Sequence, residues 1–484
     1  MTLEFNEIIF GKNDIRGKVG IDFTPELYKI IGKAYTEYLS IKENNANLIR
    51  GKWVTVGYDA RKHSPELTKA LIEGLVESGL NVYEMGLCPT PMGYYSEYKI
   101  PGVIGTLIVT ASHNPPEYNG IKMTYNKTSF SEHDIAELKE LTKIGNFPPA
   151  SQKGKSEKYN IISEYIKTYE NEFKGAGNGL KVVVDSANAT GGIVAPELYR
   201  KMGCEVIELF SEPDGDFPNH HPNPSDPETL EDLKLKVKET NADFGIAFDG
   251  DSDRIGIVDD KGNSLAGDRF MLIFALDIIK QTKEETPVFV SEVKCSQILY
   301  DTIEQNGGRA IMWKTGHGFI KSKMKEENAL MAGEMSGHIF FKDRYFGYDD
   351  AIYAGCRFIE VISQKKAENP DFSVSSFIDS FPKTFTSEEV RTPCPNEHKY
   401  RIVQELQQEF ALKPDVFNNK IEKVIVIDGV RLVFKDGFAL IRASNTEPVF
   451  TLRFEAGTQE NLANYRTKML EIVENKLKDI KSLC

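Results

Sequence analysis

The stretch KWVTVGYDAR (Lys52–Arg61) is an apolar, β-branched run that is followed by the amphipathic stretch ELTKALIEGLVESG and a second apolar run, LNVYEMG. The amphipathic stretch ends at Gly79, a residue suited to the left-handed position that closes a helix. Together these features are the pattern of a β-α-β unit. Such a unit predicts parallel strands with helices packed on both faces of the sheet.

The same pattern occurs twice more along the chain. It is formed by KVVVDSANA (Lys181–Ala189) with CEVIELF, and by TPVFVSEVKCS (Thr286–Ser296) with RAIMWKTGHG. The copies are about one domain length apart, which is too far for a solenoid repeat. The sequence therefore predicts three related α/β domains, each with a mixed arrangement of sheet and helices.

The C-terminal part has a different pattern. Short apolar runs separated by Asp-Gly turns fill Lys423–Ala456, and the helical stretch ENLANYRTKMLEIVENKLKDI follows them. This order predicts a smaller α+β domain. The polar, proline-dotted segment Ala367–Thr392 is expected to be a linker. We expect four domains around a central cleft, with the bounds 1–157, 158–262, 263–378 and 379–484.

Composition limits the classes of protein that this chain can belong to. The 484 residues carry a net charge of −13, and no apolar stretch is long enough for a membrane span. The acidic balance excludes a broad nucleic-acid surface, so neither a nucleic-acid nor a membrane partner is expected. Six cysteines without C-x-x-C pairs predict neither a zinc site nor a disulfide framework. With no signal peptide pattern at the N-terminus, a reducing cytoplasmic setting is expected.

Two polar loops follow apolar strands and carry candidate reactive groups. In VIGTLIVTASHNPPEYNGIK (Val103–Lys122), Ser112 lies just past the end of a predicted strand, where open α/β sheets bind ligands. Ser112 is either a phosphoryl acceptor or nucleophile, or part of a plain turn. In FGIAFDGDSDR, three aspartates alternate along the loop after another strand. They predict a Mg²⁺ or Ca²⁺ site, with a solvated acidic turn as the alternative.

Two further loops offer groups that suit sugar and phosphate binding. In LMAGEMSGH, Glu334 and Ser336 can bind adjacent sugar hydroxyls and His338 can move a proton, although a plain turn is the alternative. In ALIRASNTEP, a guanidinium, hydroxyls and an amide suit an unreactive phosphate clamp, or else a structural turn. The residues of this second set are Arg442, Ser444, Asn445 and Thr446.

The ordered set TASHNP, DGDSDR, GEMSGH and RASNTEP strongly resembles the α-D-phosphohexomutase superfamily. Each motif falls in its own predicted domain. The segments DIRG, GYDARKHSPEL, WKTGHGFIKSKM and FKDRYFGYDDAIY extend the resemblance over nearly the whole chain. GEMSGH points to the phosphomannomutase/phosphoglucomutase group, because phosphoglucosamine mutases usually carry GEQSGH.

The resemblance implies a role for each domain and for particular residues. The first domain would carry the phosphoserine, Ser112, and the second would bind Mg²⁺. The third would bind the sugar through Glu334 and Ser336, and the fourth the unreactive phosphate through Arg442, Ser444, Asn445 and Thr446. The implied Mg²⁺ ligands are the phosphate on Ser112 and the side chains of Asp249, Asp251 and Asp253.

The resemblance also implies which groups surround the reacting phosphate. Arg16, Lys122 and Arg254 would line the reacting centre, with Lys294 and His317 nearby. His338, Lys122 and Arg16 are the candidates for general acid and base. One departure from the family pattern is Asn13, which replaces the tyrosine that usually precedes DIRG.

The implied activity is a two-step phosphoryl relay between hexose 1-phosphate and hexose 6-phosphate, of mannose, glucose or both. Phosphoserine 112 would give its phosphoryl group to the sugar, and the resulting hexose 1,6-bisphosphate would turn round and return its other phosphate. The alternatives are a phosphoglucosamine mutase and, more remotely, a Mg²⁺-dependent sugar-phosphate phosphatase. The expected partner is the phosphosugar substrate, and the protein would be a monomer or a dimer.

Overall fold

The computed structural model describes residues 4–412, 417, 419–444 and 448–481. The chain divides into two compact units, the first formed by residues 1–274 and 336–375 and the second by residues 275–335 and 376–484. Among the described helices, none combines the length and the apolar character that crossing a bilayer requires.

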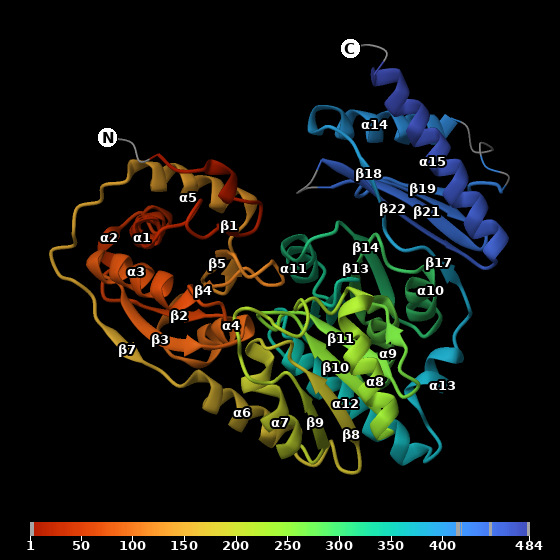
Figure 1. Ribbon diagram of the computed structural model, residues 1–484, viewed down its shortest axis with the longest axis horizontal. Helices are drawn as coiled ribbons and strands as arrows, with labels where there is room; N and C mark the ends of the chain where they lie inside the picture. The colour runs from red at the N-terminus through yellow and green to blue at the C-terminus, as the bar shows by residue number, and fades with distance from the viewer. Residues whose placement is uncertain (1–3, 413–416, 418, 445–447, 482–484) are drawn as a thin grey trace. The chain divides into compact units, whose positions relative to one another are not determined.

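The first sheet of the first unit has the strand order β1-β5-β4-β2-β3-β7, with β6 paired to β5 (Figure 1). Strand β2 is parallel to β3 and β4, as the first β-α-β pattern predicts. Strand β5, however, is antiparallel to β1 and β4, because the loop from β4 to β5 is too short for a crossover helix. The sheet is therefore mixed and not purely parallel. Its strands are β1 (Ile15–Lys18), β2 (Trp53–Tyr58), β3 (Asn81–Leu87), β4 (Val103–Val109), β5 (Tyr118–Tyr125), β6 (Thr128–Ser129) and β7 (Ser156–Lys158).

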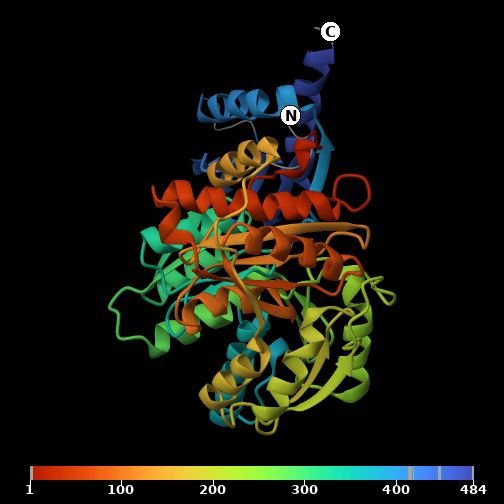
Figure 2. The ribbon, with the colours of Figure 1, turned by 90° about the vertical axis from the view of Figure 1, so that its left-hand side faces the viewer.

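Helices cover both faces of this sheet. Leu107 and Val109 of β4 belong to an apolar core that also contains residues of α1, α3 and α5, whereas Ile108 lies against Gly93 of α4. Because successive strand residues point to opposite faces, α4 packs on the face opposite α1 and α3. Figure 2 shows the red helix α1 running across one face of the sheet. The helices are α1 (Pro25–Lys42), α2 (Ala46–Ile49), α3 (Ser64–Glu77), α4 (Thr90–Lys99), α5 (Glu132–Ile144) and the short 3₁₀ helix η1 (Glu7–Ile9).

The second sheet of the first unit has the order β12-β11-β10-β8-β9. Strand β8 is parallel to β9 and β10, whereas β10 and β11 form an antiparallel hairpin around the acidic loop, residues 249–254. The strands are β8 (Lys181–Asp185), β9 (Glu205–Leu209), β10 (Phe244–Phe248), β11 (Ile255–Asp259) and β12 (Ser264–Leu265). Around them lie α6 (Ile161–Glu172), η2 (Thr190–Ile193), α7 (Ala195–Lys201), η3 (Pro227–Leu230) and α8 (Glu231–Thr240). The later segment of this unit adds β16 (Ile339–Phe341) and α12 (Ala351–Glu368).

In the second unit, β13 is parallel to β14, as the third β-α-β pattern predicts, and it is also parallel to β15. The elements are β13 (Val288–Glu292), α10 (Gln297–Gln305), β14 (Arg309–Trp313), α11 (His317–Glu326) and β15 (Met331–Gly333). Helix α9 (Gly267–Gln281) begins in the first unit and ends in the second.

The C-terminal sheet has the order β17-β22-β21-β20-β19, with β18 also paired to β22, and all of its pairs are antiparallel. Its strands are β17 (Phe385–Thr386), β18 (Val390–Pro393), β19 (Lys423–Ile425), β20 (Val430–Phe434), β21 (Gly437–Ala443) and β22 (Val449–Ala456). The accompanying helices are α14 (Asn396–Leu412) and α15 (Gln459–Lys481), whereas α13 (Val374–Asp379) precedes the sheet and the amide of its Ser375 donates to Asp260. The expected class of three α/β domains followed by an α+β domain is confirmed.

The expectation that Ala367–Thr392 is a linker is wrong in part. This segment contains the end of α12, the whole of α13 and two edge strands, β17 and β18, that pair with β22. Edge strands of two to four residues with mostly exposed or half-exposed side chains leave no apolar period in the sequence. Their pairing is set by the neighbouring strand.

Candidate active site

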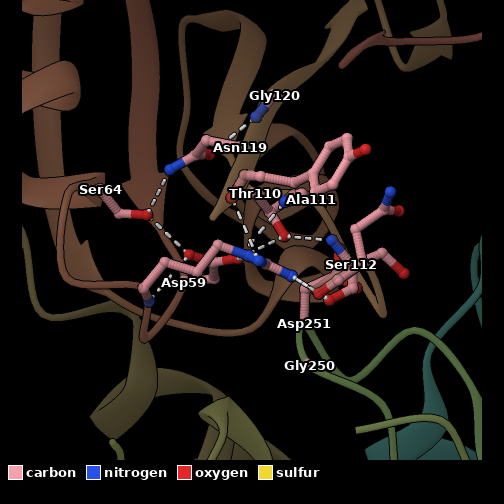
Figure 3. A network of polar contacts seen from close by, with 12 residues as sticks. Asp59, Ser64, Thr110, Ala111, Ser112, Asn119, Gly120, Gly250 and Asp251 are labelled. Atoms are coloured by element: carbon pink, nitrogen blue, oxygen red, sulfur yellow. Dashed lines mark hydrogen bonds and ion pairs between the residues drawn. The ribbon is translucent and has the colours of Figure 1, made fainter. Parts of the chain in front are cut away.

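Ser112 lies three residues past the end of β4, in the loop that leads to β5. Its side chain is buried, and its φ of 50° is in the left-handed region that a residue with a Cβ rarely adopts. Its Oγ donates a hydrogen bond to Oδ2 of Asp249 at 2.7 Å and lies 3.2 Å from Nδ1 of His113. Figure 3 shows the Ser112 loop facing the loop that carries Gly250 and Asp251. The hydroxyl is thus placed directly against the acidic loop.

The three aspartates of the acidic loop lie together in the hairpin between β10 and β11. All three are fully buried, and one oxygen atom from each lies within 4.8 Å of the others. Burial and the neighbouring carboxylates of Asp253 and Asp251 raise the pKa of Asp249 well above its ordinary value. Three buried carboxylates so close together repel one another unless a cation offsets their charge.

The donor set of this loop fits a hard divalent cation. Asp249 Oδ1 accepts hydrogen bonds from the backbone amides of Asp253 and Arg254 at 3.0 and 3.1 Å, which fixes the loop. Oδ1 of Asp251 and Oδ1 of Asp253 are buried and have no hydrogen-bond partner. Oxygen-only ligands with open positions are what Mg²⁺ prefers.

Lys122 on β5 supplies a positive charge to the same cluster. Its Nζ donates to Oδ2 of Asp251 at 2.7 Å and forms a second, short ion pair with Oδ2 of Asp253. Burial works against the charge on Lys122, but Asp251 and Asp253 outweigh it and raise its pKa well above the ordinary value. Lys122 is therefore a fixed cation at this site.

Arg16 on β1 lies beside the Ser112 loop, since β1 pairs with β5. Its guanidinium donates to Oδ1 of Asn114 at 2.6 Å and pairs with Asp14. Its buried Nε has no hydrogen-bond partner. The structure therefore brings Arg16, Lys122 and Ser112 into one region, as the sequence predicts.

Arg254 and His338 meet although 84 residues separate them. Nε of Arg254 donates to Nε2 of His338 at 2.9 Å, and Nδ1 of His338 lies 3.0 Å from Oδ2 of Asp349. Because Nε2 accepts a hydrogen bond, the imidazole proton is assigned to Nδ1, on the side of Asp349. Asp349 is a site residue that the sequence analysis missed, and its only signal was its position in the segment FKDRYFGYDDAIY.

The second unit contains Glu334, Lys294 and His317, three of the residues expected to bind the substrate. Oε1 of Glu334 accepts a hydrogen bond from the backbone amide of Gly316, which directly precedes His317 at the start of α11. Lys294 pairs with the buried Glu292 at 3.5 Å. Burial opposes ionisation of Glu292, but Lys294, the Met335 amide and Arg442 are among the groups that together outweigh it and lower the pKa of Glu292.

Glu292 is a second residue that the sequence analysis missed. Its Oε1 accepts from the backbone amide of Met335 at 2.7 Å, so it supports the loop that carries Glu334. It occupies the last position of β13, which ends a buried apolar strand, and that position was the available signal. Ser336, the next residue of the loop, begins the later segment of the first unit.

Arg442 is the next-to-last residue of β21 in the C-terminal sheet, and its side chain is buried. Its Nε and Nη2 both lie on Oδ2 of Asp428, at 3.1 and 3.0 Å. The same oxygen accepts a hydrogen bond from the backbone amide of Thr315 at 3.1 Å, which ties this arginine to the loop before His317. The carbonyl of Ser444 accepts from Nζ of Lys399 at 2.6 Å. Asn445 and Thr446 lie outside the described residues.

Comparison with protein families assigns the four parts of the chain. Residues 7–147, 163–262 and 266–384 match the phosphoglucomutase/phosphomannomutase alpha/beta/alpha domains I, II and III, and residues 389–472 match the C-terminal domain of the same family. These four matches follow the order of the four sheets.

Whole-chain relatives agree with the domain matches. A phosphomannomutase/phosphoglucomutase of Pseudomonas syringae pv. tomato is 43% identical over 456 residues, which is 94% of this chain and 93% of that protein. A phosphoglucomutase of Neisseria gonorrhoeae is 39% identical, over 96% of this chain and 97% of that protein. The crystal structure of a phosphoglucomutase/phosphomannomutase family protein from Burkholderia thailandensis matches with a TM-score of 0.86 and 33% identity, covering 98% of each chain. The chain therefore belongs to the phosphoglucomutase/phosphomannomutase family and is a hexose phosphate mutase, an isomerase.

Proposed function

We propose that this mutase interconverts the 1- and 6-phosphates of mannose, glucose or both, with Ser112 as the residue that carries the phosphoryl group. The observation that supports this most directly is the 2.7 Å hydrogen bond from Ser112 Oγ to Asp249 inside a buried acidic loop. The Ser112 hydroxyl lies against a candidate metal site and near positively charged side chains. This arrangement suits phosphoryl transfer.

Asp249, Asp251 and Asp253, together with a phosphate oxygen on Ser112, would hold Mg²⁺. The ion would neutralise the charge that develops on the transferring phosphoryl group. The two unpartnered carboxylate oxygens of Asp251 and Asp253 are the atoms that favour this assignment.

Different residues of the chain stabilise the phosphoryl group and transfer the proton in each step. The free hydroxyl oxygen of the sugar forms a bond to phosphorus in line with Ser112 Oγ, the bond from phosphorus to Ser112 Oγ breaks, and the hydroxyl proton passes through His338 to the departing Ser112 oxygen. Lys122 and Arg16 are charged as they stand, so they stabilise the phosphoryl group but accept no proton. Nε2 of His338 accepts a hydrogen bond from Nε of Arg254, so His338 is the group that takes the hydroxyl proton once Arg254 moves to the phosphate.

The second transfer reverses the first on the other end of the sugar. The hexose 1,6-bisphosphate turns round so that its second phosphate faces Ser112. Ser112 Oγ gives its proton to His338 and bonds to phosphorus, the bond from phosphorus to the sugar oxygen breaks, and the proton passes from His338 to that oxygen. Glu334 and Ser336 would bind sugar hydroxyls, with Lys294 and His317 beside them. The unreactive phosphate would be held by Arg442, Ser444, Asn445 and Thr446.

The cysteines support the proposed cytoplasmic setting. Five of them are free and buried, and the sixth, Cys484, lies outside the described residues. Free, buried thiols are typical of proteins in a reducing compartment.

A coupled assay and mass spectrometry test the proposed function. Mannose, glucose and glucosamine 1-phosphates are compared in the presence of Mg²⁺ and a catalytic amount of glucose 1,6-bisphosphate, and inorganic phosphate is measured alongside. We expect conversion of mannose or glucose 1-phosphate to the 6-phosphate with little free phosphate. Preference for glucosamine 1-phosphate would indicate a phosphoglucosamine mutase, and stoichiometric phosphate release would indicate a phosphatase.

The role of Ser112 is tested by the Ser112→Ala variant. We expect turnover to fall by several orders of magnitude and the mass of one phosphoryl group to be lost from the intact protein, with an unchanged melting temperature. Ser186→Ala is the matched control, since Ser186 is also a buried serine just past a strand end. Near-normal mutase activity in Ser112→Ala would contradict the relay.

A further inference from the structure

The loop that carries Ser112 turns its backbone carbonyls toward one buried guanidinium. Nη2 of Arg61 donates to the carbonyls of Ser112 and Asn114 at 2.9 and 2.6 Å, and Nη1 donates to those of Pro115 and Tyr118 at 2.5 and 3.1 Å. The Arg61 side chain is fully buried. One side chain therefore fixes three backbone positions of the loop between β4 and β5 and the first residue of β5.

Asp59 holds this guanidinium and reaches the same loop by a second route. Its Oδ2 accepts from Nε of Arg61 at 2.9 Å and from Oγ1 of Thr110 at 2.8 Å, as Figure 3 shows around the labelled Asp59. Oγ1 of Thr110 in turn accepts from the backbone amide of Ser112 at 2.9 Å. Both polar groups of the Ser112 backbone, the amide and the carbonyl, are thus tied to Asp59.

The backbone of Ser112 needs such support because its φ of 50° is unfavourable for a residue with a Cβ. The loop is confined from the opposite side as well. A Cβ at Gly250 would lie 2.3 Å from the carbonyl oxygen of Ser112, so only glycine lets the acidic loop approach this closely. The ring of Phe217 lies 5.4 Å from the Arg61 guanidinium and covers it.

We propose that Asp59 and Arg61 are positioning residues that hold the Ser112 backbone in one conformation whether the serine is bare or phosphorylated. The inference rests on the proposed role of Ser112 as the phosphoryl carrier. Each transfer removes or restores a charge of about −1.5 to −2 on Ser112, in a site lined by Arg16, Lys122 and Arg254. Arg61 binds backbone carbonyls and not the serine side chain, so its hydrogen bonds do not depend on the charge of the phosphoryl group on Ser112.

This role predicts a particular kinetic defect. Phosphoryl transfer depends on in-line placement of the phosphorus, so a backbone released by loss of Arg61 lowers the rate of transfer more than it lowers substrate binding. A misplaced phosphoserine also lets water compete with the sugar hydroxyl, which releases inorganic phosphate. A merely structural role would lower the melting temperature without lowering kcat more than substrate binding.

The experiment compares Arg61→Met, Arg61→Lys and the control Lys62→Met, whose exposed side chain pairs with Asp216. Turnover, KM for mannose 1-phosphate, phosphate release per isomerisation, phosphate on Ser112 and melting temperature are measured for each. We expect Arg61→Met to lower kcat about 100-fold, with KM within about threefold and a clear rise in phosphate release. Arg61→Lys should recover only part of the rate, since an ammonium cannot reproduce the fork that spans four carbonyls.

A second variant covers the case in which Arg61→Met fails to fold. Thr110→Val removes the hydroxyl that accepts from the Ser112 amide and preserves the shape of the side chain. Because the same hydroxyl also donates to Asp59, the variant loses two buried hydrogen bonds, and it should lower kcat at least about tenfold without raising KM. If Arg61→Met folds and has wild-type kcat and wild-type phosphate release, the inference is overturned and the proposed function is not. If Arg61→Met does not fold, the same result in Thr110→Val overturns the inference. A wild-type protein that stays unphosphorylated at Ser112 after treatment with glucose 1,6-bisphosphate would overturn the proposed function, and this inference with it.

Discussion

Oδ2 of Asp349 lies 3.0 Å from Nδ1 of His338, and Nε2, on the other side of the ring, accepts a hydrogen bond from Arg254, which assigns the ring proton to Nδ1. Asp349 and His338 are eleven positions apart in the chain, on opposite sides of β16 (Ile339–Phe341). An imidazole held in this tautomer can accept a proton only at Nε2, and the carboxylate stabilises the imidazolium that results. The Asp349 carboxylate is therefore placed beside the imidazole of His338, where its charge favours the protonated ring.

Replacing Asp349 with asparagine should lower kcat about 100- to 1,000-fold and change KM little, because the amide lacks the charge that stabilises protonated His338. The measurement is kcat for Asp349→Asn in the wild-type and in the His338→Ala backgrounds. Since the carboxylate acts through the ring, the substitution should have little further effect once the ring is gone. An equal loss in both backgrounds would show that Asp349 acts by another route.

Removal of the metal should abolish turnover and lower the melting temperature. After chelation, added Mg²⁺ should raise the melting temperature of the wild-type protein, because a ligand that binds only the folded state stabilises it. Asp251→Asn should lose most of this response, and its activity should not return at high Mg²⁺. Asp232→Asn, on the exposed surface of α8, is the matched control. A full Mg²⁺ response in Asp251→Asn would contradict the assignment of this carboxylate as a ligand.

Arg442→Lys should raise KM for the phosphosugar about 10- to 100-fold and affect kcat less. The Arg442 guanidinium is oriented by Asp428 through both Nε and Nη2, and a lysine can neither be held in this way nor bind a phosphate with two parallel hydrogen bonds. Arg401→Lys, which replaces an exposed arginine of α14, is the control. A fall in kcat at unchanged KM would place Arg442 at the reacting phosphate instead.

Glu97 should make stability fall as pH rises toward neutrality. Burial raises the pKa of Glu97 to about 7, although the Thr124 hydroxyl and the Lys127 amide donate to it. The folded state therefore binds more protons than the unfolded state between about pH 4.5 and 7, and the free energy of unfolding decreases across this window. The decrease should amount to about 2–3 kcal/mol.

The measurement is the free energy of unfolding in urea at pH 5 and pH 8, for the wild type and for Glu97→Gln. Glutamine does not titrate, so the difference between the two proteins should shift by about 2–3 kcal/mol in favour of the variant at the higher pH. Glu73→Gln, at an exposed position of α3, should show no such shift. A constant difference at both pH values would mean that Glu97 ionises normally.

Much of the local structure and the reactive loops could be predicted from the sequence. The strand before Ser112 and the strand before Asp249 are apolar runs that end abruptly in polar residues, and the structure has both. Strand and helix periods are local properties, so a single sequence reveals them. The edge strands in the expected linker could not be predicted, because their pairing depends on β22 and not on their own period.

The sequence by itself determined the order of the β-α-β units, the C-terminal α+β domain and which loops carry serine, aspartates and arginine. Only the tertiary structure decided which of these groups meet. Ser112 and Asp249 are 137 residues apart, and Arg61 is 51 residues from the serine whose carbonyl it binds. The proton position on His338 and the charge on Lys122 are likewise set by partners brought close only by folding. The reason is physical: periodicity acts between near neighbours, whereas burial and the fields of distant charges fix protonation states and side-chain roles.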